Sequence, residues 1–135
     1  MRGLAFAPPL LLAFLSAGPL LAQAVLYDVA AVSTGCAQNG ESCLAAVRGQ
    51  IATLRARNLT PVQFNTQIAS LAGVVADIAR TAPAAARAGL AQTLRALAQS
   101  SGNPQQAAAI LRVAGLVEAG TMPAPVAVAQ ELSAS

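Results

Sequence analysis

Residues 60–80 read TPVQFNTQIASLAGVVADIAR, and this stretch carries the clearest helix signals in the chain. Thr60 suits the cap position before a helix, Pro61 its first turn and Gln63 its third position, which is the pattern of a capping box. Large apolar residues then recur at spacings of four, three, four and three, at Phe64, Ile68, Leu71, Val75 and Ile78. Because that period places them on one face of a helix, we predict an amphipathic helix from Pro61 to Arg80.

Similar helix starts recur along the chain at intervals of 21, 22 and 21 residues, at Gly40, Pro61, Pro83 and Pro104. They predict three more alanine-rich helices, over about 41–57, 83–99 and 104–119. Asn103 suits the cap of the last helix, and Gly120 suits its end. The four stretches share only their hydrophobic spacing, which favours a bundle over a solenoid repeat. We therefore predict an all-α fold, a small up-down four-helix bundle with short loops.

The apolar stripes also predict how the first two helices pack. The stripe at Ile68, Leu71, Val75 and Ile78 is expected to meet the stripe of the preceding helix, at Val47, Ile51 and Leu54. The opposite face of the second helix is expected to contact water, at Gln63, Gln67, Ser70 and Asp77.

Each predicted helix contains an internal glycine, at Gly49, Gly73, Gly89 and Gly115. A glycine inside a helix costs about 1 kcal/mol relative to alanine. Small residues four positions away would let two helix backbones approach closely, within the bundle or in self-association through Ala/Gly faces. In a chain with 34 alanines among 135 residues such pairs also arise by chance, and both interpretations stay open.

The first 24 residues have the pattern of a secretory signal peptide. Arg2 is followed by an apolar region rich in leucine, and Ala22-Gln23-Ala24 fits a cleavage site. We expect cleavage after Ala24 and export to the periplasm or medium of a bacterium. An uncleaved anchor over 4–22 is disfavoured by its three prolines, and a lipoprotein cysteine at Cys36 by its distance from the apolar region.

The remaining chain divides into three parts. Residues 25–39 lack a clear period and are expected to form an extended N-terminal segment. Residues 40–120 are the predicted helical bundle. Residues 121–135 form a tail that begins with two prolines, in which 126–132 form a short helix or stay disordered.

Cys36 and Cys43 are expected to form a disulfide. Six residues separate them, and Asn39-Gly40 between them is a strong turn signal. An even number of cysteines in an exported protein is typical of disulfides. A redox-active pair is disfavoured, because the spacing is wider than Cys-x-x-Cys and the loop has no basic residue to lower a thiol pKa.

The composition excludes several kinds of chemistry. The chain has eight arginines, no lysine and no histidine, so it cannot build a Ser-His-Asp triad, a P-loop or a Schiff base. Two cysteines without histidine cannot assemble a usual zinc site. The five acids lie at least ten residues apart, at Asp28, Glu41, Asp77, Glu118 and Glu131. We expect no enzyme activity, no cofactor and no metal.

Arginines are the candidate binding residues. Arg80, Arg87, Arg95 and Arg112 lie in a span without an acid between Asp77 and Glu118, which suggests a face for an anionic partner. Arg48 and Arg55, seven residues apart, share a face of the first helix. From Val25 onward seven arginines and five acids leave a net charge of +2, with no aromatic platform or basic cluster, so nucleic-acid binding is not expected.

A lysine-free chain rich in alanine and arginine resembles, in composition alone, exported proteins of GC-rich bacteria. The leading hypothesis is a non-enzymatic structural or protein-interaction module of the cell envelope, with an unknown partner. One alternative is a weak peripheral binder of anionic membrane or envelope polymer through arginine faces. Another is a small-molecule carrier with its ligand between helices, which few aromatic residues support, since only Tyr27 and Phe64 remain after the signal.

Overall fold

The computed structural model describes residues 24–133. This part of the chain is all-helical, as predicted, and forms the helices α3 (Val29–Gln38), α4 (Gly40–Arg55), α5 (Pro61–Arg80), α6 (Ala84–Ser100), α7 (Pro104–Ala119) and α8 (Pro125–Ser133). The predicted signal peptide lies outside the described residues, apart from Ala24. None of the helices within residues 24–133 is long and apolar enough to cross a membrane.

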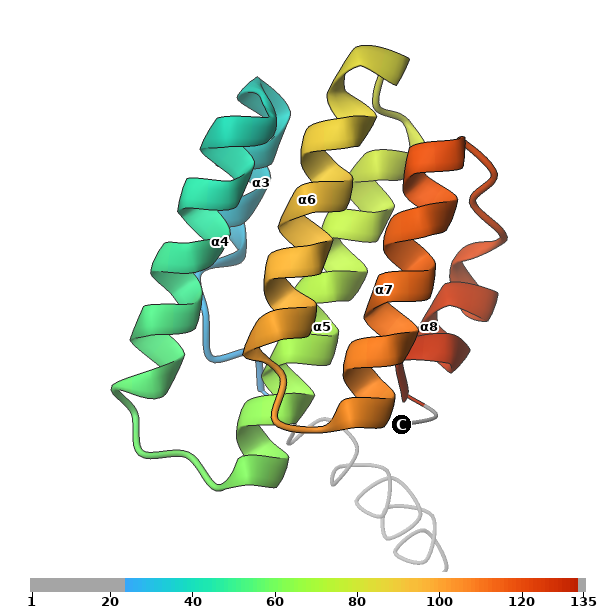
Figure 1. Cartoon of the computed structure of the whole chain (residues 1–135). Helices are drawn as coiled ribbons and strands as arrows, with labels where there is room; N and C mark the ends of the chain where they lie inside the picture. The colour runs from blue at the N-terminus through green and yellow to red at the C-terminus, as the bar shows by residue number, and fades with distance from the viewer. Residues whose placement is uncertain (1–23, 134–135) are drawn as a thin grey trace, which may run out of the picture.

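The helices form two layers, and successive helices run in opposite directions (Figure 1). In one layer α6 lies between α4 and α7 and contacts both extensively. In the other layer α5 lies between α3 and α8, and it also packs against α6 and α7. Residues 24–133 thus form six helices: the four that were predicted, α8 where the sequence left a terminal helix open, and α3, which was not expected.

The predicted helix ends at α5 and α7 are confirmed. The Thr60 hydroxyl accepts from Gln63 N at 3.1 Å, and the Gln63 side chain accepts from Thr60 N at 3.0 Å, which completes the capping box. Asn103 caps α7 by accepting from the backbone N–H groups of Gln105 and Gln106. Gly120 ends α7 with φ 73°, a left-handed conformation that glycine adopts without a steric penalty.

The expectation of an extended segment over 25–39 is wrong, because Val29–Gln38 forms α3. The Asp28 carboxylate caps this helix by accepting from Ala31 N at 3.0 Å. Val32 and Cys36, four residues apart, are its buried residues, so its apolar face is one narrow stripe. Asn39 alone separates α3 from α4 and caps α4 through Ser42 N, in line with the predicted turn signal.

The C-terminal tail contains a short helix, which decides between the two alternatives that the sequence left open. Pro125 is the first residue of α8, and Val128 and Leu132 are its buried residues. The helix packs against α5 and α7. Its Glu131 pairs with Arg112 of α7, which fixes this end of the chain to the domain.

Helices α4 and α6 cross closely at two glycines. A Cβ atom placed on Gly89 would lie 2.6 Å from the Cα atom of Gly40, and a Cβ on Gly40 would lie equally close to the Cα of Gly89. At Gly49, Gly73 and Gly115 an added Cβ would meet no atom within 4 Å. Close crossing therefore explains Gly89 among the four internal glycines and does not explain the other three.

The predicted core residues are buried, but the predicted pairing of α4 with α5 is mostly wrong. Leu71, Val75, Val47 and Leu54 have 0% exposure, whereas Ile78 is only partly buried. Helix α4 packs mainly on α6 and α3 and only marginally on α5. The Gly40–Gly89 crossing brings α6 close to α4, and α6 therefore takes the place in which α5 was expected.

The face of α5 that was expected to contact water is partly covered by the N-terminal residues. Gln67 is 6% exposed; its Oε1 accepts from Leu26 N at 2.9 Å, and its Nε2 donates to Ala24 O at 3.0 Å. The hydroxyls of Tyr27 and Ser70 lie 2.6 Å apart and share a hydrogen bond. The prediction of a solvated Gln67 is wrong because it took no account of what residues 24–28 would contact.

Replacing Gln67 by alanine is expected to lower the free energy of unfolding of the mature chain by about 1 kcal/mol, because the Leu26 N–H group would lose its acceptor. Urea denaturation of the wild type and the variant measures the difference. The matched control is Gln99→Ala, since the Gln99 side chain is exposed and makes no hydrogen bond within residues 24–133. This substitution should change stability by less than about 0.5 kcal/mol. Equal effects of the two substitutions would contradict this anchoring role.

The Cys36–Cys43 disulfide predicted from the sequence is present. It joins the last turn of α3 to the first turn of α4, and both cysteines are buried. Because Asn39 is the only residue between these two helices, the bond holds a very tight helix–helix turn.

Replacing both cysteines by serine is expected to lower the free energy of unfolding by about 2 kcal/mol, since the unfolded chain regains the freedom that a short covalent loop removes. The helices should persist, because the bond lies at one end of the domain. Denaturation followed by circular dichroism tests this result, with the reduced wild type as the control. A variant as stable as the oxidised wild type, or a loss of all helical signal, would contradict it.

Candidate functional site

A hollow opens at one end of the domain, where α4 and α6 end and α5 begins. Its volume is about 420 Å³. The lining combines one arginine, two asparagine amides, several apolar side chains and two residues at and after the end of α6. The lining residues are Leu54, Arg55, Asn58, Leu59, Pro61, Phe64, Asn65, Ser100 and Gly102. No acidic residue lines it among the described residues.

Local structure at the ends of α4 and α5 places these side chains. Asn58 adopts φ 55°, a left-handed conformation that asparagine tolerates better than most residues, and it turns the chain after α4. The capping box at Thr60 then starts α5, which sets Phe64 and Asn65 in its first turns. Partly buried Leu59 and Phe64 pack against the edge of the core, and the hollow thus has an apolar floor.

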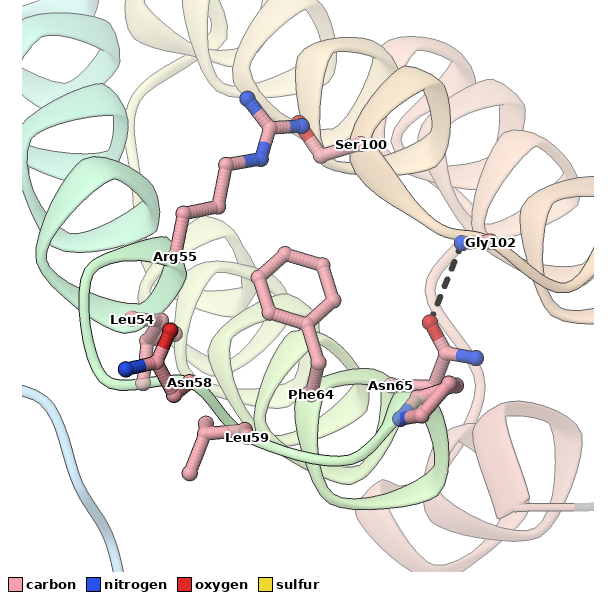
Figure 2. A pocket seen from close by; sticks show the side chains of 9 residues that line it. Leu54, Arg55, Asn58, Leu59, Phe64, Asn65, Ser100 and Gly102 are labelled. Carbon is pink, nitrogen blue, oxygen red and sulfur yellow. Dashed lines mark hydrogen bonds between the residues drawn. The ribbon is translucent and has the colours of Figure 1, made fainter.

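Phe64 and Arg55 form the centre of the hollow. Figure 2 shows the Phe64 ring in the middle of the lining residues, with the Arg55 side chain and Ser100 on one side and Asn65 on the other. The Arg55 guanidinium carbon lies 5.8 Å from the centroid of the ring, within cation–π range. This contact favours a guanidinium held over the apolar floor.

Asn65 lines the hollow and accepts two hydrogen bonds. Its Oδ1 accepts from Gly102 N at 3.0 Å, drawn as the dashed line in Figure 2. Its backbone carbonyl accepts from Gln106 Nε2 at 2.8 Å. These two bonds hold the residue between α5 and the turn before α7, while the Asn65 Nδ2 group has no partner within the described part of the chain.

A second, smaller hollow of about 270 Å³ continues along the α4–α6 surface. It shares Arg55 and Ser100 with the first and adds Arg48. Neither Arg48 nor Arg55 has an acidic partner within residues 24–133, and both are exposed. The two hollows therefore form one surface, the α4 arginine surface, with two unpaired cations and no acid lining it.

The four arginines of the sequence-predicted anion-binding face are placed differently. Arg95 binds Glu118 with two hydrogen bonds, at 3.1 and 3.3 Å, and Arg112 pairs with Glu131. The acids lie far from these arginines in sequence, but α6–α7 and α7–α8 packing brings them together. Both pairs tie neighbouring helices to each other.

Arg80 and Arg87 lie close to the loop between α7 and α8. The Arg80 guanidinium donates to Pro123 O and lies 3.6 Å from the Asp77 carboxylate. The Arg87 guanidinium lies against Gly120, where a Cβ would be 3.1 Å from its carbon, at the negative end of α7. The structure thus brings these two arginines to one loop and does not gather all four on one open face.

Two further observations concern metal ligands and titratable groups among the described residues. No group of three or more His, Cys, Asp or Glu that could hold a metal occurs within residues 24–133. Burial raises the pKa of Tyr27, partly offset by its hydrogen bond to Ser70. Because the neutral phenol is favoured in the folded state, this contribution to stability is present below pH 10 and is lost at higher pH, far from neutrality.

Part of this surface could be predicted from the sequence. The seven-residue spacing of Arg48 and Arg55 indicated a shared helix face, and the structure places both on one surface. The apolar spacing places Phe64 on the core face of its helix, whereas in the structure its side chain is only partly buried. The role of Asn65 had no signal, because its partner Gly102 is 37 residues away.

A scan of protein-family models found no match to this chain, and searches of curated proteins and of solved structures found none either.

Proposed function

We propose that this protein is an exported, non-enzymatic interaction module of the bacterial cell envelope. The observation that carries the proposal is the α4 arginine surface, on which Arg48 and Arg55 stay unpaired while Arg95 and Arg112 hold helices together. A domain that pairs some cations internally and leaves two beside an apolar hollow is suited to bind a partner.

Export is the second part of the proposal. It rests on the Ala22-Gln23-Ala24 site and on the disulfide, which is compatible with an oxidising compartment. Cleavage after Ala24 would remove the carbonyl that Gln67 Nε2 binds. It would leave the contacts of Leu26 with Gln67 and of Tyr27 with Ser70, so the mature N-terminus would stay attached to α5.

The proposal also includes a division of roles within the fold. Helices α4 to α7 would form the up-down four-helix unit expected from the sequence, with α3 and α8 as attached helices. The internal arginine pairs and the disulfide would then serve rigidity, and the α4 arginine surface would serve binding. Peripheral contact with an anionic envelope component is the form of interaction that two unpaired cations favour.

Retention on envelope fractions tests the proposal. The mature chain is expected to bind at low ionic strength and to dissociate as salt rises, because exposed charges are screened. Arg55→Gln should weaken retention, whereas the matched control Arg57→Gln should not, since Arg57 is exposed nearby and lines neither hollow. Retention that changes neither with salt concentration nor with either substitution would indicate apolar docking through another face. No retention at any salt concentration would contradict the proposal.

A further inference from the structure

We infer that the hollow at Arg55 and Phe64 is a binding site for a small carboxylate with an apolar body, such as a medium-chain or aromatic acid. The inference rests on the proposed function and specifies a ligand class for the same surface. It makes the protein a binder of a small amphipathic anion in the envelope.

The charge of the site selects an anion. Arg55 is the only charged side chain that lines the larger hollow within the described chain, and no acid there neutralises it. A guanidinium presents parallel N–H donors that match a carboxylate. The cation–π contact with Phe64 limits the loss of freedom when Arg55 binds.

The floor of the site selects an apolar body. Its apolar lining consists of Leu54, which has 0% exposure, together with Leu59, Pro61 and Phe64. A volume of about 420 Å³ lies within the range of small-molecule sites, about 300–1,000 Å³. A carboxylate at Arg55 can therefore place its chain or ring on this floor, and the smaller hollow beside Arg48 can receive a longer chain.

The helix dipoles at this end of the domain partly oppose the binding of an anion. Helices α4 and α6 end here, and the negative ends of two helices disfavour an anion, whereas α5 begins here and favours one. These partial charges act over about one turn and are screened by water, and the full charge of Arg55 outweighs them. The balance predicts weak binding, with a Kd on the order of 1 mM for a ligand of about ten heavy atoms.

An NMR titration of the ¹⁵N-labelled mature chain tests the inference, with octanoate as the probe and 1-octanol and inorganic phosphate as controls. Octanoate should shift the amide signals of residues 55–65 and 100–102 in a saturable way. Octanol and phosphate should each bind at least about threefold more weakly, because each offers only one of the two required groups. Equal binding of octanol would overturn the role of the cation, and equal binding of phosphate would overturn the apolar body.

Substitutions locate the site and keep the test independent of folding. Arg55→Gln should weaken octanoate binding about 3- to 10-fold, a modest factor because the guanidinium is exposed. Phe64→Leu should weaken it through loss of the ring, and Arg57→Gln should leave it unchanged. An unchanged spectrum away from the hollow shows that each variant is folded. Equal effects of Arg55→Gln and Arg57→Gln, or no saturable shift in the wild type, would overturn the inference.

The two proposals fail in different ways. Envelope retention without octanoate binding overturns the ligand class and leaves the interaction module standing. Octanoate binding without envelope retention supports the ligand class and overturns the proposed attachment to the envelope.

Discussion

Replacing Leu71 by alanine is expected to lower the free energy of unfolding by about 2–5 kcal/mol, the largest effect that we predict. Leu71 has 0% exposure at the centre of α5. This helix contacts both neighbours in its own layer and packs on α6 and α7 of the other layer, so a cavity there would be enclosed by well-packed neighbours. The loss combines the transfer of the apolar group with the cavity that is left behind.

Val62→Ala is the matched control. Val62 lies on the same helix and is 75% exposed, so deleting its two methyl groups should change stability by less than about 0.5 kcal/mol. Urea denaturation midpoints of the two variants, at equal m-values, decide the comparison. A Leu71→Ala variant as mild as Val62→Ala would show that this face of α5 is not buried.

Replacing Gly89 by valine is expected to destabilise the protein by about 3 kcal/mol. The nearest atoms to an added Cβ are Gly40 Cα at 2.6 Å and Gly40 C and N, each at 3.5 Å, and all three are backbone atoms. No rotamer change can relieve such a clash, so α4 and α6 would have to separate. Their separation would also disturb the start of α4, which holds the disulfide.

The same substitution at Gly115 provides the control. Gly115 lies inside α7, is exposed, and has no atom within 4 Å of an added Cβ. Gly115→Val should therefore be neutral or stabilising by a few tenths of a kcal/mol, because valine has the higher helix propensity. Thermal denaturation of both variants measures the difference. Similar melting temperatures would show that α4 and α6 do not cross at Gly40 and Gly89.

The sequence predicted the helices because their signals are local. The capping box at Thr60, the Asn103 cap and Gly120 each act within a few residues, and the structure confirms all three. The helix over Val29–Gln38 was missed because only Val32 and Cys36 of its stripe are buried, and two residues give no visible period.

Packing between helices was predicted less well, because it depends on contacts between distant residues. Gln67 was predicted to contact water because the sequence does not show that residues 24–26 bind its side chain. The packing of α6 beside α4 was not predicted because it depends on the contact between Gly40 and Gly89, which are 49 residues apart. The ion pairs of Arg95 and Arg112 likewise depend on residues that are distant in the sequence. Glu118 is 23 residues from Arg95 and Glu131 is 19 residues from Arg112, so spacing alone could not show that these cations are paired.

The proposed export is tested by the mass of the intact, non-reduced protein recovered from the bacterial periplasm, because the proposed role in the envelope requires export and the disulfide is compatible with it. The account predicts a single species that begins at Val25 and is two hydrogens lighter than its reduced form. A full-length chain found only in the cytoplasm, with Cys36 and Cys43 both open to alkylation without reductant, would contradict it.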